Sequence, residues 1–111
     1  MKLLAWNCRG LSSPHAVRSL LEVQKRINPD VFFLSETHLD KAKADNVRRR
    51  AGFDHLIIHE SDGRSGGLLL LWKEEVNIRF QAVTQNYIDV VIEEKWWMEV
   101  YWGVWRTGLE A

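Results

Sequence analysis

A short apolar run, a helix-like segment and a second apolar run succeed one another within the first 37 residues. This order restricts the fold more than any other feature of the chain. Residues 2–6 form the first run, residues 14–28 carry apolar side chains at helical spacing after the helix-starting pair Ser13-Pro14, and residues 31–34 form the second run without a polar break. A strand–helix–strand segment of this length is a right-handed βαβ unit with two parallel strands. The chain is therefore predicted to begin as an α/β domain.

The rest of the chain predicts one more helix and then strands. Asp40 is a suitable N-cap, and Gly52 is suited to the left-handed position that ends a helix. After Gly52 the apolar pattern changes to short runs separated by polar turns, which predicts strands over residues 53–59, 66–72, 76–84 and 87–92. We expect these strands to form antiparallel hairpins that extend the first sheet.

Composition limits the class of protein. The 111 residues are 46% hydrophobic and 27% charged, as in a single folded domain, and 15 basic side chains balance 15 acidic ones. No whole-molecule field therefore attracts nucleic acid or an anionic membrane. The apolar runs are far shorter than the roughly 20 residues that span a bilayer. With no secretion signal after Met1 and a single cysteine, Cys8, we expect an intracellular protein that does not enter membranes.

Two polar side chains directly follow the two parallel strands. Asn7 comes after the first strand and Glu36 after the second. Because the carboxyl ends of parallel strands meet at one edge of a sheet, we expect these side chains to emerge together, where open α/β folds bind ligands. A carboxylate oxygen at this place suits a hard divalent cation such as Mg²⁺. The alternatives are a solvated loop acid for Glu36 and a turn-forming asparagine for Asn7.

Other polar residues have simpler structural interpretations. The segment Gly63-Arg64-Ser65-Gly66-Gly67 lacks the ending of a P-loop and reads as a tight turn, although Arg64 remains a candidate phosphate contact. Three cations in the last turn of the second predicted helix complement its dipole. The histidines show no metal-ligand spacing on a shared helix and are interpreted as surface or edge residues, and Cys8 as an inert thiol. The cations are Arg48, Arg49 and Arg50, and the histidines are His15, His38, His55 and His59.

Three sequence blocks together resemble one known family. Residues 1–11 (MKLLAWNCRGL), 33–37 (FLSET) and 63–73 (GRSGGLLLLWK) resemble the N-terminal half of the endonuclease/exonuclease/phosphatase superfamily, in the form found in plant LINE-type non-LTR retrotransposons. The resemblance implies half of a four-layer α/β sandwich, related to deoxyribonuclease I, with its site at one edge of two packed sheets. It also implies Mg²⁺-dependent DNA phosphodiester hydrolysis, with Mn²⁺ as a substitute metal, and a nuclear location.

The resemblance assigns roles to two residues and leaves others unfilled. Asn7 matches the active-site asparagine of the family and Glu36 its metal-binding glutamate, so both are candidate catalytic and metal-binding residues. Three later family blocks are not recognisable here: Tyr-Gly, Gly-Asp-x-Asn and Ser-Asp-His, the last of which carries the general-base histidine. Each positioned acid–base group typically contributes about 10²-fold or more to the rate. We therefore expect an endonuclease remnant that is inactive as this chain and whose Mg²⁺ binding is weak or lost.

The last residues do not continue the resemblance. Residues 96–111 hold four of the six tryptophans. Back-translation shifted by one nucleotide allows Trp-Arg-Phe-Thr-Gly-Val-Tyr-Gly-x-Pro, the block that the family would have next. We therefore divide the chain into a truncated domain, residues 1–95, and a frameshifted tail, residues 96–111. Sequencing the coding DNA for the later blocks in the shifted frame tests this hypothesis.

Two other functions fit the sequence. One is a non-catalytic module that binds nucleic acid or a protein through the basic last turn of the second predicted helix and the tryptophan-rich tail. The other is a fragment of a superfamily phosphatase that acts on lipids or nucleotides. Truncation of the sandwich has a structural consequence, because a half-domain is expected to expose an apolar sheet face larger than soluble monomers tolerate. We therefore expect self-association or poor solubility, and a monomer that melts cooperatively would contradict this expectation.

Overall fold

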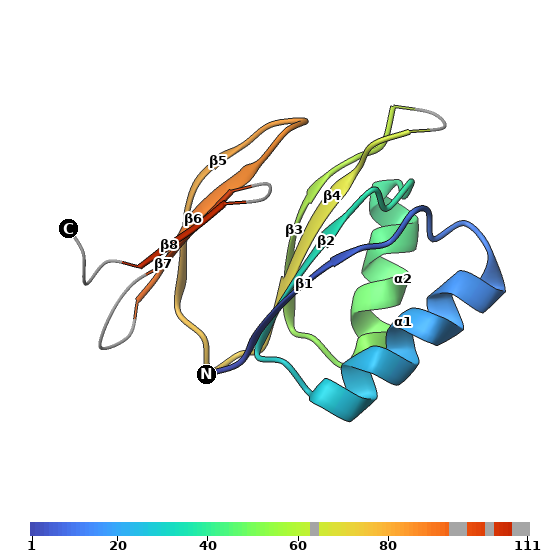
Figure 1. The fold of residues 1–111 in the computed structure, drawn as a ribbon, viewed down its shortest axis with the longest axis horizontal. Helices are drawn as coiled ribbons and strands as arrows, with labels where there is room; N and C mark the ends of the chain where they lie inside the picture. Colours follow the sequence, from blue (N-terminus) through green and yellow to red (C-terminus); the bar gives the residue numbers. More distant parts are fainter. Residues whose placement is uncertain (63–64, 94–97, 102–103, 108–111) are drawn as a thin grey trace.

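The computed structural model describes residues 1–62, 65–93, 98–101 and 104–107, with side chains described up to residue 93. It has three layers: a pair of helices, a first sheet and a second sheet (Figure 1). This is the mixed α/β architecture predicted from the sequence, and it corresponds to one side and the middle of a four-layer sandwich. Neither described helix is long and apolar enough to cross a bilayer.

The predicted βαβ unit forms as expected. Strand β1 (Leu3–Asn7) and strand β2 (Val31–Ser35) are parallel, with Leu3 opposite Val31 and Asn7 opposite Ser35. Helix α1 (Pro14–Ile27) connects them. It begins where the Ser13 side chain accepts a hydrogen bond from the Ala16 N–H, and it ends at the left-handed residue Asn28.

The second helix covers the same face of the first sheet. Helix α2 (Lys41–Ala51) starts at the Asp40 side chain, which accepts from the Lys43 N–H, and ends at Gly52 with φ of 79°, as predicted. The two helices bury a core against β1, β2 and β4. Its fully buried side chains include Leu20, Phe32, Leu34, Leu69 and Leu71.

Two of the later strands join the first sheet. Strand β3 (His55–His59) and strand β4 (Leu68–Trp72) form an antiparallel hairpin, and β4 also pairs antiparallel with β2. The strand order is β1-β2-β4-β3, so β4 enters between β2 and β3. The hairpin thus extends the first sheet, as the sequence predicted.

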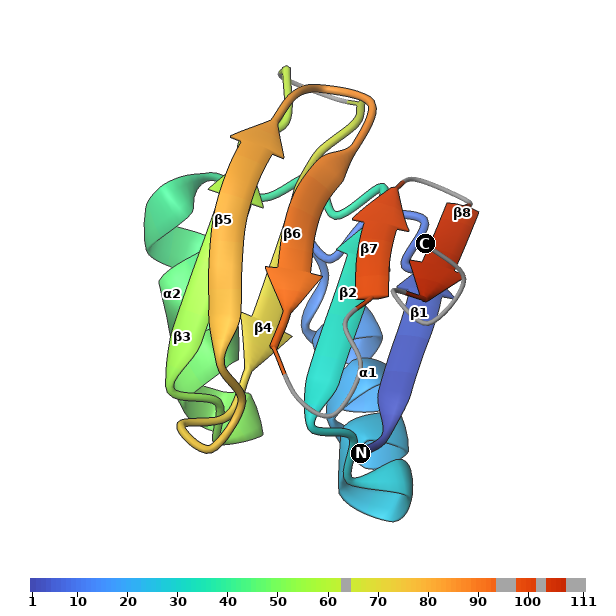
Figure 2. The ribbon, with the colours of Figure 1, turned by 90° about the vertical axis from the view of Figure 1, so that its left-hand side faces the viewer.

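The next strands form a separate sheet, and here the prediction of a single extended sheet is wrong. Strand β5 (Ile78–Val83), strand β6 (Ile88–Ile92), strand β7 (Met98–Tyr101) and strand β8 (Val104–Thr107) pair in that order. Figure 2 shows this second sheet lying across the first. Alternate side chains of β6 explain the separation, because they pack against the helix-free face of the first sheet. They are Ile88, Val90 and Ile92, all fully buried.

The second sheet changes the expected surface. It covers the apolar face of the first sheet, where Val31, Phe33 and Leu70 lie, so that face is not exposed as the sequence led us to expect. Among the side chains that the structure describes, the exposed large hydrophobic ones are Met1 and Phe80. No helix covers the outer face of the second sheet within the described residues. This outer face is the one that a four-layer sandwich would bury.

Candidate active site

The candidate site lies where β1 and β2 end. Backbone hydrogen bonds continue there past both strands. The Cys8 N–H donates to the Ser35 carbonyl at 2.9 Å, and the Gly10 N–H donates to the Glu36 carbonyl at 2.7 Å. The segment before β4 joins them, since the Thr37 N–H donates to the Gly67 carbonyl at 3.1 Å. Three chain segments are thus tied together at one edge of the sheet. The backbones of Asn7 and Glu36 lie at this common edge, as the βαβ geometry predicts.

Glu36 stands in an unusual backbone conformation. Its φ is 53°, in the left-handed region that residues with a Cβ rarely adopt. His38 is also left-handed, with φ of 56°, and its Nε2 lies 3.5 Å from Glu36 Oε2. The His38 ring packs against Gly10, where an added Cβ would come within 2.7 Å of Nδ1. With 46% of its side chain exposed, the Glu36 carboxylate is accessible to a ligand.

Asn7 lies on the adjacent strand and shapes the turn that follows. It pairs in register with Ser35, so the two side chains share the face of the first sheet that is turned towards the second. Asn7 Oδ1 accepts a hydrogen bond from the Arg9 N–H at 3.1 Å. This is the turn-forming role that the sequence offered as an alternative, and it holds the carboxamide at the edge of the sheet.

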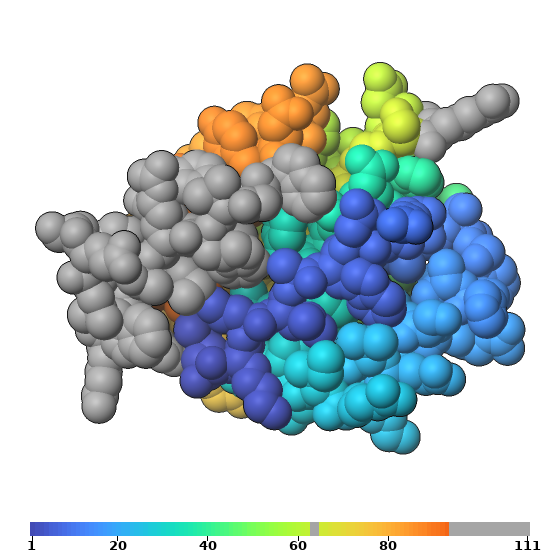
Figure 3. All heavy atoms as spheres, viewed as in Figure 1, coloured from blue at the N-terminus to red at the C-terminus, as the bar shows by residue number. Residues whose placement is uncertain are grey.

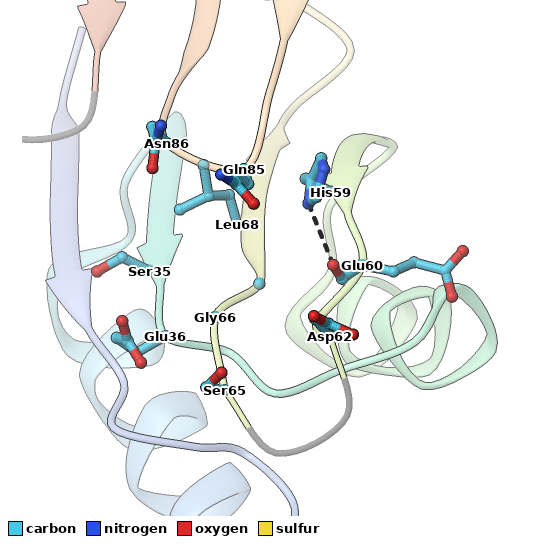
Figure 4. Close-up of a pocket in the computed structure, with 11 residues that line it drawn as sticks. Ser35, Glu36, His59, Glu60, Asp62, Ser65, Gly66, Leu68, Gln85 and Asn86 are labelled. Atoms are coloured by element: carbon cyan, nitrogen blue, oxygen red, sulfur yellow. Dashed lines mark hydrogen bonds between the residues drawn. The ribbon is translucent and has the colours of Figure 1, made fainter.

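A cleft of about 330 Å³ opens beside Glu36. It lies between the edge of the first sheet and the turn of the β5–β6 hairpin, and Figure 3 shows the hollow between the orange hairpin and the yellow-green segment before β4. Figure 4 shows the lining side chains, with Ser35 and Glu36 at one side and His59 across Leu68. Glu60, Asp62, Ser65, Gln85 and Asn86 complete the polar lining. The cleft is therefore polar and open, as a site for a charged ligand must be.

The oxygen donors at this edge fit a hard divalent cation. Glu36 offers a carboxylate, and the neutral oxygens come from Ser35, which precedes it in the chain, and from Asn7, the register partner of Ser35. The Ser35 hydroxyl is buried and has no hydrogen-bond partner. Mg²⁺ commonly binds through one or two carboxylates and keeps several waters, so this set is compatible with it. Within the described residues, no group of three His, Cys, Asp or Glu side chains is arranged to hold a metal.

The other sequence candidates that the structure describes have structural explanations. Arg64 lies outside the described residues. Arg48 is engaged within its own helix region, donating to Asp45 Oδ1 at 2.9 Å and to the Phe53 carbonyl at 3.0 Å. Its hydrogen bond lowers the pKa of the Asp45 carboxyl. Burial raises the pKa of Cys8 to about 12, which keeps the thiol protonated and unreactive at neutral pH.

The histidines do not form a common site, but His38 lies beside Glu36 and His59 lies on the opposite side of the cleft (Figure 4). His38 contacts the Glu36 carboxylate, and His59 lines the cleft with Nδ1 3.1 Å from the Glu60 carbonyl. The sequence predicts surface or strand-edge positions for both, and no short pattern in it indicates that they lie at the site. His55 lies at the other end of β3, where it stacks on Trp72 and pairs with Glu74 at 2.9 Å.

Comparison with known proteins decides the family. Residues 4–104 match the endonuclease/exonuclease/phosphatase family. The chain belongs to this family. The match runs past residue 95 and into β8, and it includes Asn7, Glu36 and the segment before β4.

Solved structures of this fold agree with the family match. An AP endonuclease from Archaeoglobus fulgidus superposes with a TM-score of 0.59 at 17% identity, covering 86% of this chain and 37% of its own. A variant of a 3′ phosphatase from Neisseria, bound to product DNA hairpin, gives a TM-score of 0.60 at 16% identity, covering 86% of this chain and 38% of its own. The chain thus spans little more than a third of either protein. None of the curated proteins compared with the chain matches it.

Proposed function

We propose that this endonuclease/exonuclease/phosphatase chain carries the cation- and phosphate-binding half of a DNA endonuclease site. The site would be inherited from a LINE-type retrotransposon. We also propose that this chain does not hydrolyse DNA. The juxtaposition of Glu36 and Asn7 at one sheet edge, beside a polar cleft, supports the proposal. The AP endonuclease and the DNA-bound 3′ phosphatase that share this fold favour DNA as the ligand. A nuclear location follows from this origin.

Each residue would have a distinct task in binding. The exposed carboxylate of Glu36 would hold Mg²⁺ or Mn²⁺, with the Asn7 carboxamide oxygen as a second ligand, and the carboxamide of Asn7 would also orient a DNA phosphate at the end of β1. A bound divalent cation supplies Lewis-acid polarisation of a phosphate and neutralises charge on the leaving oxygen. Arg64 precedes the cleft-lining Ser65 in the chain and would contact the DNA backbone. These groups bind and orient DNA.

Hydrolysis also needs a group that removes a proton from the attacking water. The Ser-Asp-His and Gly-Asp-x-Asn blocks that supply this function in the family are not recognisable in the chain. Positioned acid–base groups each contribute about 10²–10⁴-fold to the rate. We therefore expect no nicking of supercoiled plasmid DNA above background when the chain is incubated with Mg²⁺ or Mn²⁺. Release of inorganic phosphate from a 3′-phosphorylated DNA hairpin would instead favour the second candidate, a phosphatase fragment like the Neisseria protein.

Replacing Glu36 with glutamine is expected to weaken Mn²⁺ binding about tenfold or more, because the change removes the charged ligand and keeps the side-chain shape. Isothermal titration of the full chain with Mn²⁺ measures this effect. Glu60→Gln is the matched control. Glu60 lines the same cleft, but its Oε2 accepts from the Lys41 N–H at 3.2 Å and its side chain extends away from Glu36 (Figure 4). Equal Mn²⁺ affinities for wild type and Glu36→Gln would contradict the proposed function.

A further inference from the structure

Ser35 has a buried hydroxyl with no partner. It is the last residue of β2 and is 1% exposed, and no hydrogen bond reaches its Oγ. Among the described side chains, one other buried polar atom lacks a hydrogen-bond partner. It is Asp89 Oδ1 in the second sheet. Buried hydroxyls nearly always have a partner, because an unpaired one loses the hydrogen bonds that water gave it. Alanine at this place would not carry that cost.

Ser35 is a direct neighbour of both proposed ligand residues, Asn7 and Glu36. Its register partner on β1 is Asn7, and both side chains share one face of the sheet. Glu36 is the next residue in the chain. In a regular strand, successive side chains point to opposite faces, but the left-handed φ of Glu36 breaks the alternation, and both residues line the same cleft. Figure 4 shows their side chains one above the other at the same side of the cleft.

A trapped water does not account for the unpaired hydroxyl. An ordered water would need room and at least two polar partners, whereas Oγ has essentially no surface that a water can reach. A divalent cation approaches more closely. Mg²⁺ binds oxygen at about 2.1 Å, while a hydroxyl and a water oxygen stay about 2.8 Å apart. A cation therefore needs less room beside a buried oxygen than a water molecule does.

We propose that Ser35 Oγ is a third protein oxygen of the divalent-cation site, beside Glu36 and Asn7. The inference rests on the proposed function, since it adds a ligand to the same site. A neutral hydroxyl adds a donor atom without adding charge, as hard cations accept. It also gives the unpaired oxygen a partner, which it has only when the cation is bound.

Ser35→Ala separates a ligand from a merely structural hydroxyl. We expect Mn²⁺ binding to the full chain, measured by titration calorimetry, to weaken about tenfold, a loss within the range seen when groups that support a metal site are removed. The urea midpoint of the metal-free protein should be unchanged or higher, because the variant no longer buries an unpaired hydroxyl. Ser65→Ala is the control, since Ser65 lines the same cleft at an exposed position, and its Mn²⁺ affinity should equal that of wild type.

Ser35→Cys tests direct contact with the cation. Thiolates prefer soft metals, so this variant should bind Mn²⁺ more weakly and Cd²⁺ more tightly than wild type, with the ultraviolet absorption of a cadmium–thiolate bond. The wild-type protein is the negative control and should not show this absorption, because its cysteine, Cys8, is buried and has a pKa raised to about 12. If Glu36-dependent Mn²⁺ binding is unaffected in Ser35→Ala, or if Ser35→Cys binds Cd²⁺ without that absorption, the inference is wrong and the proposed function stands. If Glu36→Gln binds Mn²⁺ as tightly as wild type, both fail.

Discussion

Phe33→Ala is expected to lower the free energy of unfolding by about 3–5 kcal/mol, the usual loss when a buried phenylalanine is removed from a core. Phe33 lies in the middle of β2, is 2% exposed, and belongs to the apolar cluster between the two sheets with Val31, Leu70 and Val90. The total free energy of unfolding of a small domain is only about 5–15 kcal/mol. Urea unfolding followed by circular dichroism should therefore show a much lower midpoint.

Phe80→Ala provides the matched control for this packing. Phe80 is on β5 and is 55% exposed, so the same truncation removes little buried surface. We expect a change within about 0.5 kcal/mol, as for most surface substitutions. Similar losses in the two variants would mean that the second sheet does not bury Phe33 in solution, and the layered arrangement would then be wrong.

Gly67→Ala is expected to destabilise the protein by about 2–4 kcal/mol, because it combines backbone strain with a steric overlap. The φ of Gly67 is 96°, a conformation that alanine rarely adopts. The added Cβ would overlap Thr37 Oγ1 and lie 3.1 Å from the His38 backbone nitrogen. Thr37 is completely buried and cannot move aside without disturbing the turn that contains Glu36. We therefore expect weaker Mn²⁺ binding together with the lower urea midpoint.

The neighbouring glycine separates strain from overlap. Gly66 has φ of 75°, but a Cβ built on it meets no atom within 4 Å. Gly66→Ala should therefore cost only the left-handed backbone, about 1–2 kcal/mol, and leave Mn²⁺ binding nearly unchanged. If Gly66→Ala is as damaging as Gly67→Ala, close packing against Thr37 is not what requires glycine at residue 67.

Local signals were sufficient for the first half of the fold. The N-caps Ser13 and Asp40 and the left-handed cap Gly52 are set by residues within a few positions of one another, so the sequence predicts both helices accurately. The assignment of strands to sheets is not local. Alternating apolar residues in β5 and β6 fit a hairpin in either sheet, and only packing against the face formed by Val31, Phe33 and Leu70 decides between them.

The site was predictable only in part, for the same reason. The rule that parallel strands end at one edge places Asn7 and Glu36 together. Ser35 could have been recognised from its position two residues after Phe33, on the same face of β2. His59, Gln85 and Asn86 reach the cleft through the β3–β4 pairing and the stacking of two sheets, and no short sequence pattern encodes these long-range contacts.

The family match extends to residue 104, and residues 98–101 and 104–107 pair as strands of the second sheet. The frameshift and the boundary at residue 95 stay hypotheses that the coding DNA can test. Self-association also stays a prediction. The surface that would mediate it is now the outer face of the second sheet, where no helix packs within the described residues.

The hydrogen bonds that tie Gly10, Thr37 and His38 to neighbouring segments have a thermodynamic consequence for recognition. A flexible loop loses conformational entropy when it closes on a ligand, and that loss is subtracted from the affinity. Here backbone hydrogen bonds from two neighbouring segments already fix the chain around Glu36. A ligand would meet a preorganised surface and would need to order little beyond the side chains it contacts.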